Sequence, residues 1–116
     1  MRSHQSEESE QVCPRFHRAV ELVGKRWTGA IVRTLMDGPR RFSEILDAVP
    51  GLHDRLLSER LKELESEGLV IRKVYADTPV RIEYELTDKG RDLERVVAEV
   101  QRWADRWLAG LTRAAH

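Results

Sequence analysis

The residues of this 116-residue sequence that could carry out chemistry do not stand in a catalytic pattern. No two of the four histidines stand at the i, i+4 spacing that places a metal-binding pair on one helix face. The chain has one cysteine and no glycine-rich loop of the kind that cradles phosphate groups. The sequence therefore predicts no catalytic residues, no metal site and no cofactor, and the protein is not expected to be an enzyme. The histidines are His4, His17, His53 and His116.

Cys13 is the side chain best suited to covalent chemistry. It precedes Pro14, a residue typical of the first turn of a helix, and a thiol at a helix N-terminus has a lowered pKa. A nearby Arg15 or Lys25 would also favour the thiolate. Because there is no second cysteine, an oxidised Cys13 could form only an intersubunit disulfide or an adduct with a small thiol. Two interpretations stay open, a redox or electrophile sensor and a small apolar residue near a dimer interface.

Charged residues are distributed unevenly along the chain. The formal net charge is zero, which by itself argues against a nucleic-acid-binding domain. Residues 14–42 nevertheless carry a net charge of +5, and residues 43–68 carry −4. In the acidic segment, Glu63, Glu65 and Glu67 fall at the far end of a predicted helix. The basic segment is therefore expected to contact phosphate groups with little repulsion from these carboxylates.

The spacing of apolar residues predicts the elements that position these side chains. Residues 1–12 lack apolar periodicity and predict a flexible arm. Residues 14–23 predict an amphipathic helix. A second helix is expected after Gly24, with Trp27 on its core face, and runs to Met36.

Two short helices around a tight turn, at about residues 43–67, predict a helix-turn-helix. Ser43 is expected to cap the first of these helices. The second turns one apolar stripe toward the core, at the i, i+4, i+7 spacing of Leu57, Leu61 and Leu64.

After Gly68 the apolar residues alternate, and residues 69–86 predict a β-hairpin that forms a wing. Thr87 is expected to cap one long helix over about residues 87–110. The predicted fold is mainly α with a small β-hairpin (α+β). It is a winged helix-turn-helix in a single domain over residues 13–111.

The exposed face of the second short helix would meet DNA, since an α-helix fits the major groove. Arg55 suits a guanine edge, Ser58 a base or a phosphate, and Lys62 a phosphate. Glu59 can only accept hydrogen bonds, from a cytosine amine or from Arg55. A solvated helix face with i, i+4 ion pairs is the alternative. Contacts to the DNA backbone are expected from Lys25, Arg26, Arg40, Arg41, Ser43, Arg72, Lys73, Tyr75 and Arg81.

Six short motifs also follow one another in a recognisable order. They are Cys13-Pro14, Gly24-Lys25-Arg26-Trp27-Thr28, Gly38-Pro39-Arg40-Arg41-Phe42-Ser43-Glu44-Ile45, Leu57-Ser58-Glu59-Arg60-Leu61-Lys62-Glu63-Leu64-Glu65, Gly68-Leu69-Val70 and Pro79-Val80-Arg81-Ile82-Glu83-Tyr84-Glu85-Leu86-Thr87-Asp88-Lys89-Gly90. Together they resemble the HxlR-type (MarR-like) winged helix-turn-helix transcriptional regulators, over about residues 13–108.

The resemblance implies a dimeric bacterial regulator of transcription that pairs through its N- and C-terminal helices. Some relatives with this Cys-Pro start sense oxidants or electrophiles through the thiol, which implies a small-molecule or oxidant inducer. His53 departs from the pattern, because the family usually has a small polar residue there. The start of the following helix is therefore expected to fray or to be capped through Asp54.

The last predicted helix carries an apolar seam that a domain of this size would leave exposed. The seam predicts a homodimer that places two recognition helices on a palindromic double-stranded DNA operator. A single cysteine and the lack of a long apolar run or signal peptide indicate a cytoplasmic protein without a membrane partner. A protein–protein interaction module and a nonspecific architectural DNA binder are the alternatives. The expected interface residues are Phe16, Val20, Val97, Val100, Trp103, Ala104 and Trp107.

Overall fold

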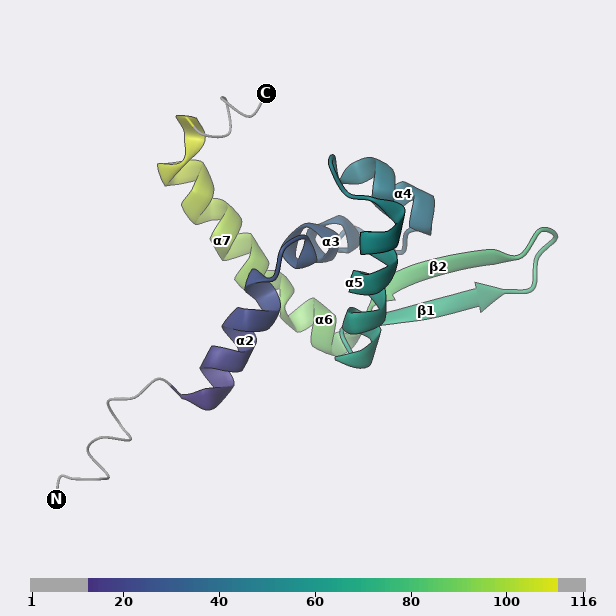
Figure 1. Cartoon of the computed structure of the whole chain (residues 1–116), viewed down its shortest axis with the longest axis horizontal. Helices are drawn as coiled ribbons and strands as arrows, with labels where there is room; N and C mark the ends of the chain where they lie inside the picture. The colour runs from purple at the N-terminus through teal and green to yellow at the C-terminus, as the bar shows by residue number, and fades with distance from the viewer. Residues whose placement is uncertain (1–12, 111–116) are drawn as a thin grey trace, which may run out of the picture.

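The computed structural model describes residues 13–110, so the flexible arm predicted at residues 1–12 lies outside the described residues. The helices α2 to α5 come first, the two strands of one hairpin follow, and two further helices end the described chain, so the fold is mainly α with one hairpin as the sequence predicts (Figure 1). They are α2 (Pro14–Gly24), α3 (Thr28–Leu35), α4 (Phe42–Ala48), α5 (Asp54–Ser66), β1 (Val70–Tyr75), β2 (Arg81–Leu86), α6 (Asp88–Asp92) and α7 (Glu94–Trp107).

The core lies where α3, α4 and α5 meet the base of the hairpin. The three α5 leucines predicted to face the core are buried, with at most 1% of their surface exposed. From α3 and α4, the side chains of Ile31, Val32 and Ile45 are fully buried against them. Burial of each such side chain is worth about 2 kcal/mol, so the helix-turn-helix is fixed to the rest of the protein by its apolar face.

The hairpin is a two-stranded antiparallel sheet that projects to one side of the helices (Figure 1). Its register pairs Val70 with Leu86 at the buried base and Tyr75 with Arg81 near the tip. Arg40, just before α4, exchanges two backbone hydrogen bonds with Tyr84 of β2, at 2.9 and 2.8 Å. These bonds fasten the wing to the start of the helix-turn-helix.

Two predictions about helix starts are wrong. Trp27 precedes α3 instead of lying within it, and its φ of 77° places it in the left-handed region, so the chain turns sharply there. Ser43 lies inside α4, and Arg41 is the N-cap residue. The backbone N–H of Arg41 donates to Glu44 Oε1 at 2.8 Å, so a glutamate caps this helix end in place of a serine.

The single long C-terminal helix predicted over residues 87–110 is also wrong, because the chain forms the short α6 and then α7. Thr87 caps α6 as expected, and its hydroxyl accepts from the Gly90 N–H. Leu93 lies between the two helices. A Cβ on Gly90 would come within 2.2 Å of the Leu69 carbonyl oxygen, so α6 packs against the start of the wing.

The helices α2 and α7 extend away from the helix-turn-helix and the wing (Figure 1). No residue of α2 is buried, and Val97 is the only buried residue of α7. Within residues 13–110, no helix is long and apolar enough to span a membrane.

Candidate nucleic-acid interface

One face of α5 carries polar side chains that no other element covers. Arg55 is 93% exposed, and its Nε lies 3.7 Å from Glu59 Oε2, one turn further along. Lys62 is also exposed, whereas Ser58 is half-buried. The predicted base-contacting residues thus share the face opposite the buried leucines. Glu59 has the partner that the sequence suggested, so this geometry also fits the alternative of a solvated face with i, i+4 pairs.

The turn before α5 brings this face into place. Gly51 has a φ of +87°, which favours glycine, and its Cα faces the Trp27 ring closely enough that a Cβ would lie 3.3 Å away. His53 is the N-cap residue of α5, and its side chain makes no capping hydrogen bond. Asp54 occupies the first turn, where its negative charge interacts favourably with the helix dipole. The structure thus agrees with the expectation that His53 is a poor cap.

Two predicted backbone-contacting residues stand at the start of α4. Arg41 and Ser43 are exposed there. Arg40 is half-buried, and its Nη1 donates to the Pro39 carbonyl at 3.0 Å. Arg40 therefore joins the helix-turn-helix to the wing through its backbone while its side chain folds onto the adjacent loop.

The cations of the wing differ in how far acidic neighbours neutralise them. Arg81 lies 2.9 Å from Asp77 and 2.8 Å from Glu83, and its guanidinium stacks 4.0 Å from the centre of the Tyr75 ring. Lys73 pairs with Glu85. Arg72 is exposed and has no ionic partner among residues 13–110. Of the three wing cations, Arg72 is the one most available to a phosphate.

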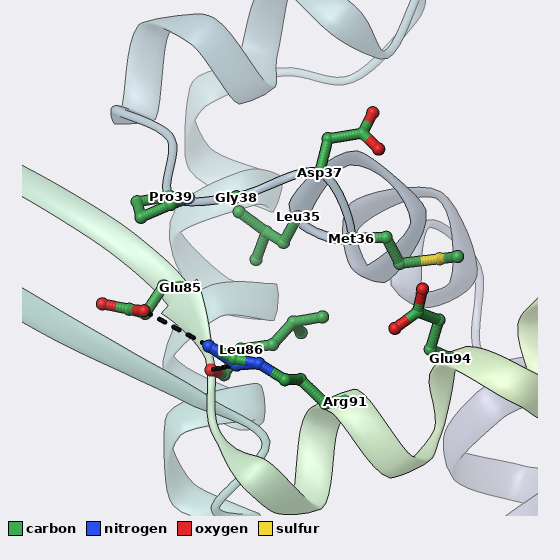
Figure 2. Close-up of a pocket in the computed structure, with 9 residues that line it drawn as sticks. All are labelled: Leu35, Met36, Asp37, Gly38, Pro39, Glu85, Leu86, Arg91 and Glu94. Carbon is green, nitrogen blue, oxygen red and sulfur yellow. Dashed lines mark hydrogen bonds and ion pairs between the residues drawn. The ribbon is translucent and has the colours of Figure 1, made fainter.

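Glu85 connects the wing to α6. The hydrogen bond and the charge of Lys73, followed by the smaller effect of Arg91, hold the pKa of Glu85 below its usual value. The same contact raises the pKa of Lys73. Figure 2 shows the Arg91 guanidinium reaching toward Glu85 and the Leu86 carbonyl, at 3.5 and 3.3 Å, in a hollow beside the end of α3. These contacts therefore form a polar joint between β2 and α6 at the base of the wing.

Lys25 and Arg26, both predicted to contact the DNA backbone, lie in the turn between α2 and α3. Lys25 Nζ lies 2.9 Å from Glu63 Oε2 on α5, and Arg26 stacks on the Trp27 ring at 4.8 Å. The Arg26 carbonyl accepts from Arg60 Nε at 3.0 Å. The sequence interpretation missed Arg60, because no local spacing reveals a contact across 34 residues.

Cys13 is exposed and is the N-cap residue of α2, directly before Pro14 as predicted. Arg15 lies in the first turn, but Lys25 follows the last turn of an 11-residue helix, about 18 Å away along the helix axis. The expectation that Lys25 could stabilise the Cys13 thiolate within one chain is therefore wrong.

Most of the predicted dimer residues are exposed apolar side chains on α2 and α7, which we call the apolar surface of α2 and α7. Ala104 is half-buried, and Val97 is only 8% exposed because it packs in the core of the protomer. Val97 is therefore a core residue within a single chain. The exposed members of the set are Phe16 (61%), Val20 (51%), Val100 (58%), Trp103 (59%) and Trp107 (63%).

No group of three or more His, Cys, Asp or Glu side chains in residues 13–110 is arranged to hold a metal ion.

Comparisons of this chain with known proteins agree on one family. Residues 22–111 match the HxlR-like helix-turn-helix family. The chain is 54% identical over 98 residues to YvaP of Bacillus subtilis, an uncharacterized HTH-type transcriptional regulator, with 84% of this chain and 91% of YvaP aligned. It is 48% identical over 96 residues to the HTH-type transcriptional regulator YodB of the same organism, covering 83% of this chain and 86% of YodB.

Solved structures show the same fold. The reduced form of YodB superposes with a TM-score of 0.75 at 47% identity, covering 84% of this chain and 95% of YodB. YodB has also been solved after diamide treatment and with quinone bound. The redox regulator HypR in its oxidized form gives a TM-score of 0.76 at 35% identity, covering 81% of this chain and 96% of HypR.

Proposed function

This chain belongs to the HxlR-like helix-turn-helix family of DNA-binding transcriptional regulators, and we propose that it acts as a homodimer on a palindromic operator. The observation that carries the proposal is the arrangement of α5. Its polar face is exposed beside the wing, while the apolar surface of α2 and α7 lies elsewhere on the molecule. The protein would act by binding DNA in the cytoplasm, without catalysis and without a cofactor.

The polar face of α5 is the proposed base-reading surface. Arg55 near the helix N-terminus has the reach and the two-pronged donor geometry that suit guanine, and Lys62 suits a phosphate. Glu59, paired with Arg55, would hold the guanidinium in place or accept from a cytosine amine. Ser58, half-buried, has a shorter reach and would contact a base or a phosphate at the edge of the surface.

Contacts to the DNA backbone would come from both sides of α5. Arg41 and Ser43 at the start of α4 form one side, and Arg72 of the wing forms the other. These groups position the protein on the duplex without reading its sequence. Lys73, Tyr75 and Arg81 would add to the wing contact only after exchanging some of their protein contacts for phosphate contacts.

The proposed dimer is supported by the exposed apolar surface of α2 and α7. Two tryptophans one helical turn apart and more than half exposed are unusual on a protein that remains a monomer. Pairing this surface with its copy would remove it from water and would give the two-fold symmetry of a palindromic site.

A response to oxidants or electrophiles through Cys13 is part of the proposal. The thiol is exposed at a helix N-terminus, and related structures include diamide-treated and quinone-bound YodB and the redox regulator HypR. The sequence contains one cysteine, so oxidation of Cys13 would form a disulfide between two protomers or an adduct with a small thiol.

Selection of bound sequences from a random DNA pool tests the function. The expected result is a palindrome whose half-sites lie about one helical turn, roughly 10 base pairs, apart. Bound DNA without any common sequence would instead support an architectural binder. Absence of any salt-sensitive DNA binding would support a protein–protein interaction module.

A further inference from the structure

Charged side chains connect α2 and the turn after it to the C-terminal half of α5. Arg18 of α2 forms an ion pair with Glu67, and Lys25 pairs with Glu63 at 2.9 Å. Arg60 of α5 donates to the Arg26 carbonyl at 3.0 Å and also lies 3.4 Å from Glu63 Oε1. Glu63 therefore accepts from the turn after α2 and from its own helix at once. We refer to Arg18, Lys25, Arg60, Glu63 and Glu67 as the α2–α5 clamp.

The clamp occupies its own stripe of α5. Positions 60 and 63 of α5 and its C-cap residue at 67 recur at i, i+3 and i+7, so they lie on one side of the helix at about 100° per residue. This stripe lies between the buried leucines and the face that carries Arg55, Glu59 and Lys62. The clamp therefore contacts α5 without occupying either its core face or its proposed DNA face.

Besides these ion pairs, α2 is held by Leu22, a half-buried side chain that packs against the core. No side chain of α2 is buried, and the helix projects from the body of the protein (Figure 1). Arg60 is the most buried member of the clamp, with 13% of its side chain exposed, whereas Arg18 and Lys25 are 63% and 45% exposed. An exposed ion pair changes an equilibrium by about fivefold at most, but a shared network restrains an orientation more than any one pair.

We infer that Arg18, Lys25 and Arg60 are positioning residues, which hold α5 at a fixed orientation to α2 and so set the half-site spacing that the dimer accepts. The inference rests on the proposed dimeric function, in which α2 contributes to the interface. The inference also assigns a second role to the uneven distribution of charge along the chain. Cations of the basic segment pair with glutamates of the acidic segment of the same chain, and Lys25 contacts Glu63 instead of a phosphate.

A charge-swap experiment tests this role. Arg18→Glu, Glu67→Arg and the double variant are compared on the selected operator and on the same operator with one base pair inserted between its half-sites. Each single variant is expected to bind the operator about three- to tenfold more weakly and to discriminate less between the two spacings. The double variant restores the ion pair with reversed polarity and is expected to recover both the affinity and the discrimination.

Arg15→Glu is the matched control, because it makes the same charge change on α2 at an exposed position that has no ionic partner among residues 13–110. It measures the general loss of DNA affinity from added negative charge and is expected to leave the spacing preference intact. Circular dichroism melting checks that each variant folds. If Arg18→Glu does not fold, a double-mutant cycle of Arg18→Gln and Glu67→Gln replaces the swap, and coupling between the two in spacing discrimination is the expected result.

Two results overturn the inference. One is a double variant that discriminates no better than the poorer single variant, and the other is unchanged discrimination in both single variants. If the wild-type protein itself shows no spacing preference, the dimeric function fails as well. If the wild-type protein shows a spacing preference and the double variant does not recover it, only the positioning role is excluded.

Discussion

Arg55 and Arg60 lie five residues apart on α5 and have different surroundings. Arg55 is almost fully exposed, while Arg60 is largely buried and donates to the backbone carbonyl of Arg26 in the turn between α2 and α3. The helical period places Arg55 opposite the buried leucines, so its exposure could be predicted from the sequence. The contacts of Arg60, Lys25 and Arg18 could not, because they depend on how separate helices pack.

At Cys13, the chemistry can be tested by one substitution. Treatment with diamide or a quinone is expected to change operator affinity of the wild-type protein about tenfold or more, since the exposed thiol is modified. Untreated Cys13→Ser should bind as the wild type does, and treatment should leave it unchanged. Fluorescence anisotropy with labelled operator gives both values. Identical responses of the two proteins would favour the interpretation of Cys13 as a small apolar residue.

At the scale of elements, apolar spacing located the helices well but not their ends. The α5 leucines and the hairpin lie where the patterns predict them. The break at Leu93 and the left-handed Trp27 were missed, because each is imposed by packing against a distant segment. In the case of α6, the packing constraint is the contact of Gly90 with the Leu69 carbonyl.

Gly90→Ala is expected to destabilise the fold by about 1–3 kcal/mol, since the new Cβ overlaps the Leu69 carbonyl. Thermal unfolding measures the loss as a melting temperature lower by roughly 4–8 °C per kcal/mol. Gly29→Ala is the control, because a Cβ there meets nothing within 4 Å and alanine favours the helix. Equal melting temperatures for Gly90→Ala and wild type would show that α6 does not pack as described.

The joint at the base of the wing predicts a dependence on pH. Lys73 and Arg91 lower the pKa of Glu85 in the folded protein, so Glu85 stabilises the fold fully above its usual pKa near 4.5. This contribution is lost as the pH falls through the lower folded value. Glu85→Gln should therefore melt below the wild type at about pH 7, and the difference should shrink toward about pH 3. A difference that is constant across this range would contradict the described contacts.

At the scale of the whole molecule, the apolar surface of α2 and α7 determines the expected assembly. The sequence predicts this surface from the seam of the last helix, and five of the seven residues assigned to it are exposed. Ala104 is half-buried and Val97 faces the core, because a helix that borders both the core and a partner divides its apolar residues between them. One chain's sequence pattern does not show where that division falls.

The double substitution Trp103→Ala and Trp107→Ala should convert the proposed dimer to monomers. Buried aromatic residues at the centre of an interface each contribute about 2 kcal/mol or more, so the dimer dissociation constant should rise at least a hundredfold. Sedimentation velocity over a range of concentrations measures the change. Arg95→Ala, an exposed change on the same helix, should leave assembly unaffected. If the tryptophan variant remains dimeric, the interface lies elsewhere.

Whether α5 reads the operator sequence can be measured by a competition titration of Arg55→Ala against wild type. The wild type should prefer the selected operator over unrelated DNA by about a thousandfold or more at a fixed salt concentration. Arg55→Ala should reduce that preference by about 1–3 kcal/mol, whereas Arg41→Ala should weaken binding to both DNAs alike. Unchanged affinity and unchanged preference in Arg55→Ala would contradict the assignment of this face to DNA.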